Sequence, residues 1–275
     1  MATSLVAFQG ERGSFSEEAA YKLLGRGIRV LPCETFAAIF ESVTRGNANY
    51  CLVPIENTLA GSVYENFDLL LANNLHIVAE VSLRIVHNLI AMPGTTRKQV
   101  RQVYSHPVAL AQCGRFFAKN PKIEKVTFYD TAGSVKMLAE QRPPGAAAIA
   151  SRIAAEVYHA HILATHLEDH RENFTRFFLL SKIARVSPKA NKVSIVFSTR
   201  NVPGALYKCL SVFALRDIDL TKMESRPLRG RPWEYFFYVD FVGSVKADHC
   251  KKALAHLSEV TNFQRVLGCY ESARR

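Results

Sequence analysis

The stretch Leu5-Val-Ala-Phe-Gln-Gly-Glu-Arg-Gly-Ser-Phe-Ser-Glu-Glu-Ala-Ala20 contains an apolar run, a turn with two glycines and the start of a helix. Residues 5–9 have the composition of a short buried strand. Ser14 stands where a helix would begin, and Glu17 follows at the spacing of a capping box. The stretch therefore predicts a strand followed by a helix, and this order recurs along residues 1–181.

Such alternation predicts parallel sheets with helices on their faces. Residues 81–92 are rich in β-branched side chains and have the pattern of a strand that crosses into a second lobe. A return crossing near residues 173–181 would leave a cleft between the lobes. We therefore expect one α/β domain over residues 1–182, with its second lobe at about residues 82–170.

The pattern changes after residues 183–191, which contain Ser187-Pro188 and which we interpret as a linker. Residues 192–271 have the order strand, helix, strand, strand, helix, strand, which is typical of the ferredoxin-like arrangement. The sequence thus predicts two α/β lobes followed by a smaller βαββαβ domain.

The chain of 275 residues has 35 Lys and Arg against 24 Asp and Glu, a formal net charge of +11. The basic residues are dispersed, and the cluster at residues 226–231 has no interleaved aromatic side chains for base stacking. The charge therefore favours a small anionic substrate over nucleic acid. No apolar run approaches the ~20 residues of a membrane span, so we expect no membrane partner.

The six cysteines are scattered and form no Cys-x-x-Cys pair. We expect reduced, mostly buried thiols in a cytoplasmic protein. Residues 1–10 contain no basic segment followed by a long apolar one, which predicts no signal peptide. The same beginning, without a transit segment, suggests a bacterial protein or a mature form whose leader has been removed.

Small polar side chains recur where predicted strands end and predicted helices begin. Each one alone is most simply a helix cap, but amides at helix starts also bind anions, and open α/β sheets bind ligands at the carboxyl ends of their strands. We therefore interpret the set as one shared site for a polyanion. Its members are Ser14, Asn57, Ser62, Ser105, Thr131 and Ser151.

The segment Asn173-Phe-Thr-Arg-Phe177 places Thr175 and Arg176 at the start of a nearly all-apolar strand. A buried arginine is costly unless it is paired. Its partner could be a carboxylate of the substrate, held by two parallel hydrogen bonds, or a carboxylate of the protein in a structural ion pair. The residues alone leave both alternatives open.

At these positions the chain resembles the prephenate dehydratase family, which includes the arogenate dehydratases. The resemblance covers nearly the whole chain in the right order, and Thr175-Arg-Phe177 matches the family's catalytic signature. This chain has Val108 where many members have Gln, and Gly133-Ser-Val135 where pairs of Ala are common. The other matching segments are residues 10–20, 53–57, 61–63, 105–107, 130–132 and 148–151.

The resemblance implies a carbon–oxygen lyase of phenylalanine biosynthesis that has a periplasmic-binding-protein-like catalytic domain. Prephenate would lose its ring hydroxyl and its ring carboxylate to give phenylpyruvate, without a cofactor or a metal. Thr175 would hydrogen-bond or protonate the leaving hydroxyl, Arg176 would balance a carboxylate, and Phe177 completes the catalytic set. The six small polar residues named above would line the cleft. No chorismate mutase region precedes the matching part, so a monofunctional enzyme is expected.

Residues 192–271 resemble the ACT regulatory domain of the same family. The resemblance implies that L-phenylalanine binds where two such domains meet and favours a less active arrangement. It also implies a homo-oligomer, expected to be a homotetramer built as a dimer of dimers. A dimerisation module without a ligand is the alternative. The phenylalanine-binding residues implied are Asn201, Pro203, Gly204, Ala205, Leu206, Glu224, Ser225 and Arg226.

Other functions remain to be distinguished. Arogenate could replace prephenate as the substrate, with phenylalanine as the direct product. A non-catalytic solute-binding protein also has two hinged lobes, and a purely regulatory amino-acid sensor would need only the smaller domain. The spacing of His159, His161, His166 and His170 could serve zinc, but we expect these residues to span a helix end, a strand and a loop and not to converge.

Overall fold

The computed structural model describes residues 4–228 and 230–273. These residues form two compact units. The larger unit contains residues 4–74 and 81–179, and the smaller unit contains residues 75–80 and 180–273. Within the described residues no helix is both long and apolar enough to cross a membrane.

The first lobe of the larger unit is built on a sheet with the strand order β5-β11-β3-β1-β2. Its central strand β1 pairs in parallel with both β2 and β3, and Val6, Ala7 and Phe8 of β1 are completely buried. In chain order its elements are β1 (Leu5–Gln9), α1 (Phe15–Leu24), β2 (Arg29–Cys33), α2 (Phe36–Thr44), β3 (Tyr50–Asn57), β4 (Gly61–Ser62), α3 (Tyr64–Ala72), β5 (His76–Arg84) and, much later, β11 (Phe174–Ser181).

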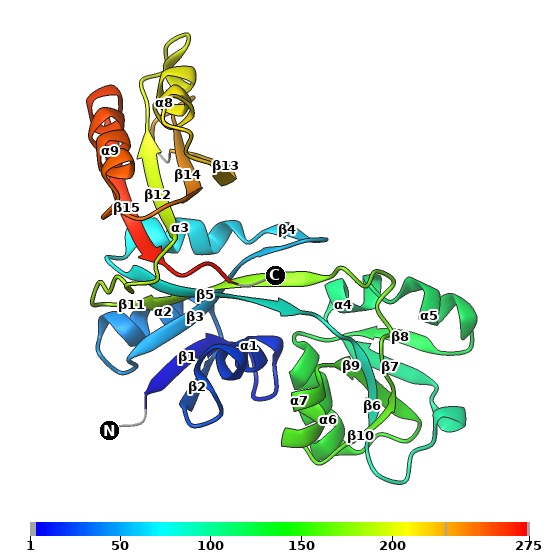
Figure 1. The fold of residues 1–275 in the computed structure, drawn as a ribbon. Helices are drawn as coiled ribbons and strands as arrows, with labels where there is room; N and C mark the ends of the chain where they lie inside the picture. Colours follow the sequence, from blue (N-terminus) through cyan, green and yellow to red (C-terminus); the bar gives the residue numbers. More distant parts are fainter. Residues whose placement is uncertain (1–3, 229, 274–275) are drawn as a thin grey trace. The chain divides into compact units, whose positions relative to one another are not determined.

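The second lobe is a separate sheet with the order β10-β6-β9-β7-β8. Helices α4 and α5 lie on one side of this sheet and α6 and α7 on the other (Figure 1). An apolar cluster lies under each pair of helices. Its elements are β6 (Asn88–Ala91), η1 (Arg97–Gln99), β7 (Gln102–Ser105), α4 (Pro107–Ala111), α5 (Gly114–Lys119), β8 (Glu124–Thr127), α6 (Thr131–Gln141), β9 (Ala146–Ala150), α7 (Arg152–Val157) and β10 (His161–Ala164).

Residues 106–119 form two helices, α4 and α5, and not one continuous helix. The carboxylate of Asp169 accepts hydrogen bonds from the backbone amides of Gly114 and Arg115, both at 2.8 Å, and so begins a new helix there. His106, and not Ser105, is the N-cap of α4. The hydroxyl of Ser105 instead donates to the carbonyl of Ile149 at 2.6 Å.

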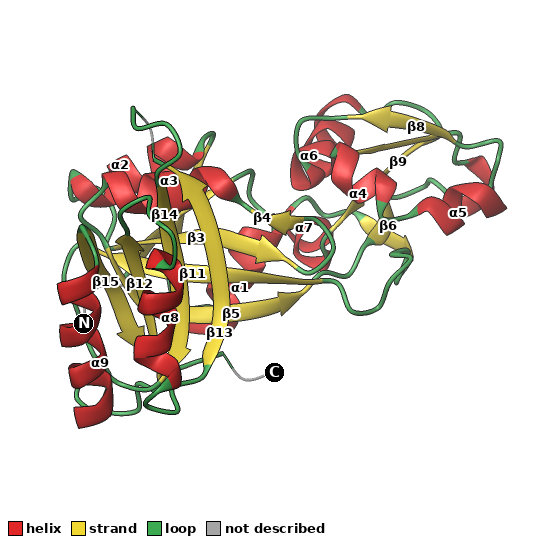
Figure 2. Ribbon diagram, turned by 90° about the horizontal axis from the view of Figure 1, so that it is seen from above, coloured by secondary structure: helices red, strands yellow, loops and turns green. Residues whose placement is uncertain are grey.

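Two crossings connect the lobes, as predicted. The chain leaves the first lobe after β5 and returns through β11, and these two strands are neighbours in the sheet (Figure 2). Beyond the strand ends the crossings stay bonded, since the amide of Ile85 donates to the carbonyl of Asn173 at 2.8 Å. The ends of both strands are therefore held together where the lobes meet.

The lobes also touch through the turn that precedes α1. Gly13 has a positive φ of 83° and lies against Ala154 of α7, so closely that a Cβ on Gly13 would lie 2.6 Å from the Cα of Ala154. The hydroxyl of Ser151 donates to the carbonyl of Gly13 at 2.5 Å. Glycine is therefore required at position 13 by both conformation and contact.

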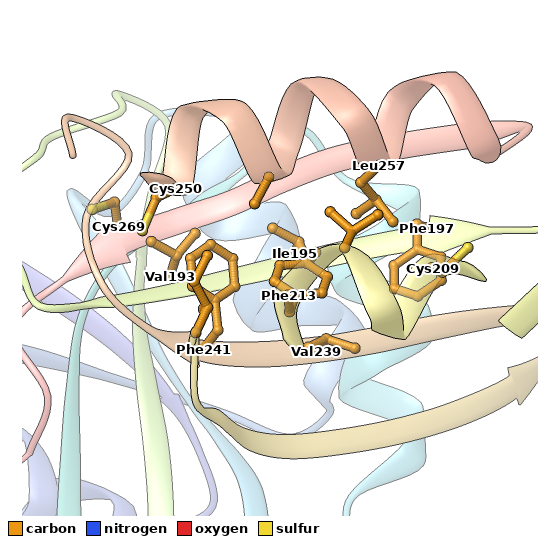
Figure 3. Packing of buried hydrophobic residues seen from close by; sticks show 13 residues of the cluster. Val193, Ile195, Phe197, Cys209, Phe213, Val239, Phe241, Cys250, Leu257 and Cys269 are labelled. Atoms are coloured by element: carbon orange, nitrogen blue, oxygen red, sulfur yellow. The ribbon is translucent and has the colours of Figure 1, made fainter. Parts of the chain in front are cut away.

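The smaller unit has the predicted βαββαβ order, with the sheet order β13-β14-β12-β15 and antiparallel neighbours. Its core lies between the sheet and two helices, where Phe197, Phe213, Phe241 and Leu257 pack together (Figure 3). Its elements are β12 (Lys192–Ser198), α8 (Ala205–Ala214), β13 (Leu220–Pro227), β14 (Tyr235–Val242), α9 (Asp248–Val260) and β15 (Phe263–Tyr270).

We expect Gly13→Ala to destabilise the protein much more than Gly25→Ala does. Both glycines have a positive φ, but a Cβ at Gly25 would meet nothing within 4 Å, so this control measures the conformational strain alone. Overpacking against Ala154 should add about 1–3 kcal/mol to the loss of unfolding free energy. Urea unfolding of both variants measures the difference, and equal losses would show that the close contact between the lobes carries no cost.

Candidate active site

A pocket of about 260 Å³ lies where the two lobes of the larger unit meet. This volume is just below the ~300–1,000 Å³ typical of pockets for drug-sized ligands, so it suits a compact metabolite. Its walls come from the start of α1, the end of β3, the two crossings and the starts of α4 and α6. The lining residues are Phe15, Ser16, Pro54, Asn57, Ala60, Ile85, His87, His106, Val108, Ala109, Gln112, Thr131, Thr175 and Phe177.

Four of the predicted site residues line this pocket together. Thr175 and Phe177 come from β11, Asn57 ends β3, and Thr131 begins α6. They lie far apart in the sequence, and the return of the chain through β11 brings them to one place. The geometry thus assembles a single pocket from three of the segments that match the family motifs.

The hydroxyls of three predicted residues are instead occupied by the backbone. Ser14 caps α1 by accepting from the amide of Glu17, Ser105 donates to a carbonyl of β9, and Ser151 caps α7 while donating to Gly13. All three are buried and none lines the pocket. The geometry therefore does not bring these hydroxyls to the predicted shared polyanion site. Ser62 is also absent from the pocket lining and lies on β4 opposite Glu56.

Arg176 is not among the residues that line this pocket. Successive side chains of a strand point to opposite faces, so Arg176 points away from the face that Thr175 and Phe177 share. Its Nη1 lies 3.2 Å from Oε1 of Glu56, and its guanidinium lies 4.7 Å over the ring of Phe178. The structure therefore has the structural ion pair, the alternative that the sequence left open, and not an arginine directed into the pocket.

Several lining residues were missed. Ser16 follows the predicted Ser14 by two positions and lines the pocket. His87 and Gln112 also line the pocket. The helical phase of α1 could have indicated Ser16, whereas nothing in the sequence distinguishes His87 and Gln112 from other buried polar residues.

The amide of Asn57 is fully used by the protein. Its Oδ1 accepts from the backbone amides of Leu59 and Ala60 at 2.9 and 2.8 Å. Its Nδ2 donates to Oδ1 of Asn173 at 2.8 Å and to Oγ1 of Thr175 at 2.9 Å. Asn57 therefore orients the site and has no donor left for a ligand.

The hydroxyl of Thr175 is thereby fixed in one role. Because Oγ1 accepts the hydrogen bond from Asn57, the Thr175 proton must point elsewhere. The side chain lines the pocket, and no acceptor within the described residues is bonded to this hydroxyl. The arrangement presents Thr175 to a ligand as a hydrogen-bond donor.

The lining contains no Asp, Glu, Lys or Arg among the described residues, and its ionisable groups are His87 and His106. Burial lowers the pKa of His87, an effect only partly offset by its hydrogen bond to Gln112 and by the charge of Glu168, and it favours the neutral ring. Ser16 and Thr131 line the pocket at the N-termini of α1 and α6, where helix dipoles favour anions. Acidic side chains offset these dipoles, because Glu17 and Glu18 lie in the first turn of α1 and Asp130 caps α6.

A larger pocket of about 530 Å³ lies beside Ser14 and Asp130. Glu11, Glu34 and Asp130 line it, so it repels anions and does not suit a dicarboxylate. At its edge Glu11 of the first lobe accepts from Tyr129 at 2.9 Å and pairs with Lys136 at 3.1 Å. These bonds join the two lobes next to the smaller pocket.

The family model described as prephenate dehydratase matches residues 6–185 of the chain. The chain belongs to the prephenate dehydratase family. The matched residues include every wall of the smaller pocket, so the predicted resemblance is confirmed.

Similar proteins cover nearly the whole chain. The chloroplastic arogenate dehydratase/prephenate dehydratase 2 of Arabidopsis thaliana is 44% identical over 96% of this chain and 72% of its own length. A prephenate dehydratase from Arthrobacter aurescens, solved in complex with L-Phe, is 31% identical with a TM-score of 0.89 and covers 98% of this chain and 90% of its own. A protein described as GqqA, a novel type of quorum quenching acylase, is 34% identical with a TM-score of 0.91 over 98% of both chains.

Gly133, one of the departures from the family pattern, accommodates the ring of Tyr129. A Cβ at position 133 would lie 2.8 Å from both Cζ and the hydroxyl of Tyr129. We expect Gly133→Ala to raise the unfolding free energy by about 0.5–1 kcal/mol in a Tyr129→Ala background, where only helix propensity acts. In the wild-type background the displaced ring should cancel that gain. Thermal unfolding of the four proteins tests this coupling, and an equal gain in both backgrounds would contradict it.

Proposed function

We propose that this chain is a prephenate dehydratase, which converts prephenate to phenylpyruvate in the formation of L-phenylalanine. One observation carries the proposal: Asn57 holds Thr175 as a hydrogen-bond donor in a pocket that is lined by family residues and carries no fixed negative charge. The family match and the relatives with this activity support it. The enzyme is accordingly a carbon–oxygen lyase.

The proposed reaction consists of two bond cleavages and one protonation. The bond from the ring to its carboxylate breaks and releases CO₂, and its electron pair completes the aromatic ring. The bond from the ring to its hydroxyl breaks, and the hydroxide leaves as water after taking one proton. Thr175 donates a hydrogen bond to this leaving oxygen, and such a positioned donor contributes about 10²–10⁴-fold. Because aromatisation drives the reaction, orientation and this hydrogen bond are the main requirements.

We assign the binding of the two carboxylates of prephenate to neutral hydrogen-bond donors of the protein. Ser16 lies at the N-terminus of α1 and Thr131 at that of α6, and their hydroxyls can donate to the ligand. The side-chain amide of Gln112 adds a donor, since its Oε1 is already bonded to His87 and Asn173. Phe15 and Phe177 give the pocket apolar surface for the ring. Arg176 supports this wall through Glu56 without touching the ligand.

We expect Thr175→Val to lower kcat for prephenate at least tenfold, because it removes the donor while nearly keeping the shape. Thr175→Ser keeps the hydroxyl and should retain much more activity. Absorbance of phenylpyruvate measures turnover, and thermal unfolding shows whether the folded state is unchanged. Full turnover of the Val variant would refute the role assigned to Thr175.

Arogenate is the alternative substrate, and the relative from Arabidopsis thaliana has both activities in its name. The pocket contains Val108, 44% exposed, where many family members have Gln, so one wall is apolar near the start of α4. This wall offers no carboxylate for the ammonium group of arogenate. We therefore favour prephenate, and a comparison of kcat/KM for the two substrates decides.

The smaller unit is proposed to be an ACT domain, with bounds at residues 192–271, that binds L-phenylalanine as a feedback effector. Three of the predicted residues, Asn201, Ala205 and Leu206, line a pocket of about 130 Å³ together with Trp233. Gly204 begins α8 with a φ of 77° and open space around it, which leaves room for a ligand at the helix start. The complex of the Arthrobacter aurescens relative with L-Phe supports an effector of this kind.

Three further predicted residues lie on β13 and not in that pocket, and Pro203, which precedes α8, is also outside its lining. Glu224, Ser225 and Arg226 pair with β14, which contributes Tyr235 and Phe237 to the pocket wall. Since β13 is the outer strand of the sheet in this unit, a second copy could bring its own residues there. This placement supports the pairing of two copies through this unit, and we propose that such pairs form a homotetramer built as a dimer of dimers. For the location, six cysteines without a disulfide support the prediction of a cytoplasmic enzyme.

We expect L-phenylalanine to bind and to lower turnover, because an effector changes activity only if it prefers one of two states. Calorimetry should show saturable binding that Leu206→Ala weakens at least fivefold. D-phenylalanine serves as the control for stereospecific recognition, and light scattering reports the oligomeric state. No binding up to millimolar L-phenylalanine would contradict an effector site in this unit.

A further inference from the structure

We propose that His87 is a positioning residue for the reaction, acting through a directed chain of hydrogen bonds that ends at the Thr175 hydroxyl. This inference deepens the proposed function and rests on it for its kinetic test. His87 lies in the crossing between β5 and β6 and is 2% exposed. Its ring lines the pocket but belongs to none of the motifs that identify the family.

The chain of hydrogen bonds has four links. Nε2 of His87 lies 2.9 Å from Oε1 of Gln112, and the same oxygen accepts from Nδ2 of Asn173 at 2.9 Å. Oδ1 of Asn173 accepts from Nδ2 of Asn57, which also donates to Thr175. Asn173 is completely buried, so each of its polar atoms needs a partner.

Only one orientation of every group satisfies these contacts. The Asn57 amide is set by the two backbone amides that donate to its oxygen. Its nitrogen therefore faces Asn173, whose own nitrogen must then face Gln112. The Gln112 oxygen accepts at both of its lone pairs, so the His87 nitrogen that faces it must carry a proton.

His87 is held rigidly enough for this role. Its backbone amide donates to the buried carboxylate of Glu168 at 2.9 Å, and its carbonyl accepts from Leu167 at 3.0 Å. The ring packs edge-to-face on Phe15 with centroids 5.6 Å apart. Nδ1 is buried and has no hydrogen-bond partner among the described residues. The ring therefore makes its one polar side-chain contact through Nε2.

Loss of the His87 donor would weaken the whole series of hydrogen bonds from His87 to Thr175. Without His87 the Gln112 amide keeps one bond and can rotate by half a turn, which would present its NH₂ group to Asn173. Two donors would then face each other, and Asn173 would have to turn with it. Asn57 would lose its acceptor, and its hold on the Thr175 hydroxyl would weaken.

The kinetic test compares His87→Leu with His87→Gln. The Leu variant removes the donor, and we expect kcat for prephenate to fall at least tenfold, with a smaller rise in KM because Gln112 is also proposed to donate to the ligand. The Gln variant places a side-chain NH₂ near the position of Nε2 and should recover kcat to within threefold of the wild type. Recovery of kcat by Gln would show that position 87 needs a hydrogen-bond donor and not only a side chain that fills the space. Equal activity of the two variants would overturn the proposal.

A double variant tests whether His87 acts through Thr175. In a Thr175→Val background, His87→Leu should change kcat less than twofold, because the group that it positions is gone. A full tenfold further loss would show that His87 acts by another route. Thermal unfolding of all variants identifies any that fails to fold.

The protonation state of His87 gives a test that needs no activity. Nitrogen-15 NMR of labelled histidines in the intact protein, with the His87→Gln variant to identify the signal, should show a neutral ring with its proton on Nε2. A proton on Nδ1 in the neutral ring would overturn the proposal. If the wild type converts neither prephenate nor arogenate, the proposed function fails. The NMR result would still show whether Nε2 of His87 carries the proton that the series of hydrogen bonds requires.

Discussion

The site depends on the hydrogen bond from Asn57 to Thr175. This hydrogen bond fixes the Thr175 hydroxyl because the Asn57 amide makes three other hydrogen bonds, which allow the amide only one orientation. A threonine hydroxyl rotates freely in isolation and can donate or accept with equal ease. Once a fixed donor occupies its oxygen, its proton can only go to another acceptor, and the pocket is where an acceptor can enter. A weak acid becomes a directed donor without any change in its intrinsic chemistry.

The neutral lining of the pocket is consistent with the proposed chemistry. An arginine in contact with the ring carboxylate would stabilise it most before the reaction, when its charge is still present. As CO₂ departs, that interaction would be lost, so tight binding of this group would raise the barrier. Helix N-termini hold anions with partial charges and are already oriented before the ligand arrives. The ion pair that keeps Arg176 away from the pocket therefore fits a decarboxylating enzyme.

The sequence was sufficient for the alternation of strands and helices and for placing Asn57 and Thr175 next to strand ends, because strand and helix periodicities show in the chain directly. It was insufficient for the role of each hydroxyl. Ser14 and Ser16 have similar surroundings in the sequence, but only the helical phase decides that the first caps α1 and the second lines the pocket. The break between α4 and α5 depends on Asp169, which is distant in the chain. Contacts of this kind follow from the fold and cannot be found by local pattern.

The two strands that reach the site also belong to the smaller unit. Residues 75–80 of the β5 segment and residues 180–181 of β11 are part of that unit, while the remaining residues of both strands are part of the larger one. Thr175 and Leu180 lie on the same strand, about 17 Å apart at the usual rise per residue. Coupling between distant sites needs an element whose arrangement both sites influence. β11 crosses the boundary between the two units, and residues 182–191 continue the chain from its end to the proposed effector domain.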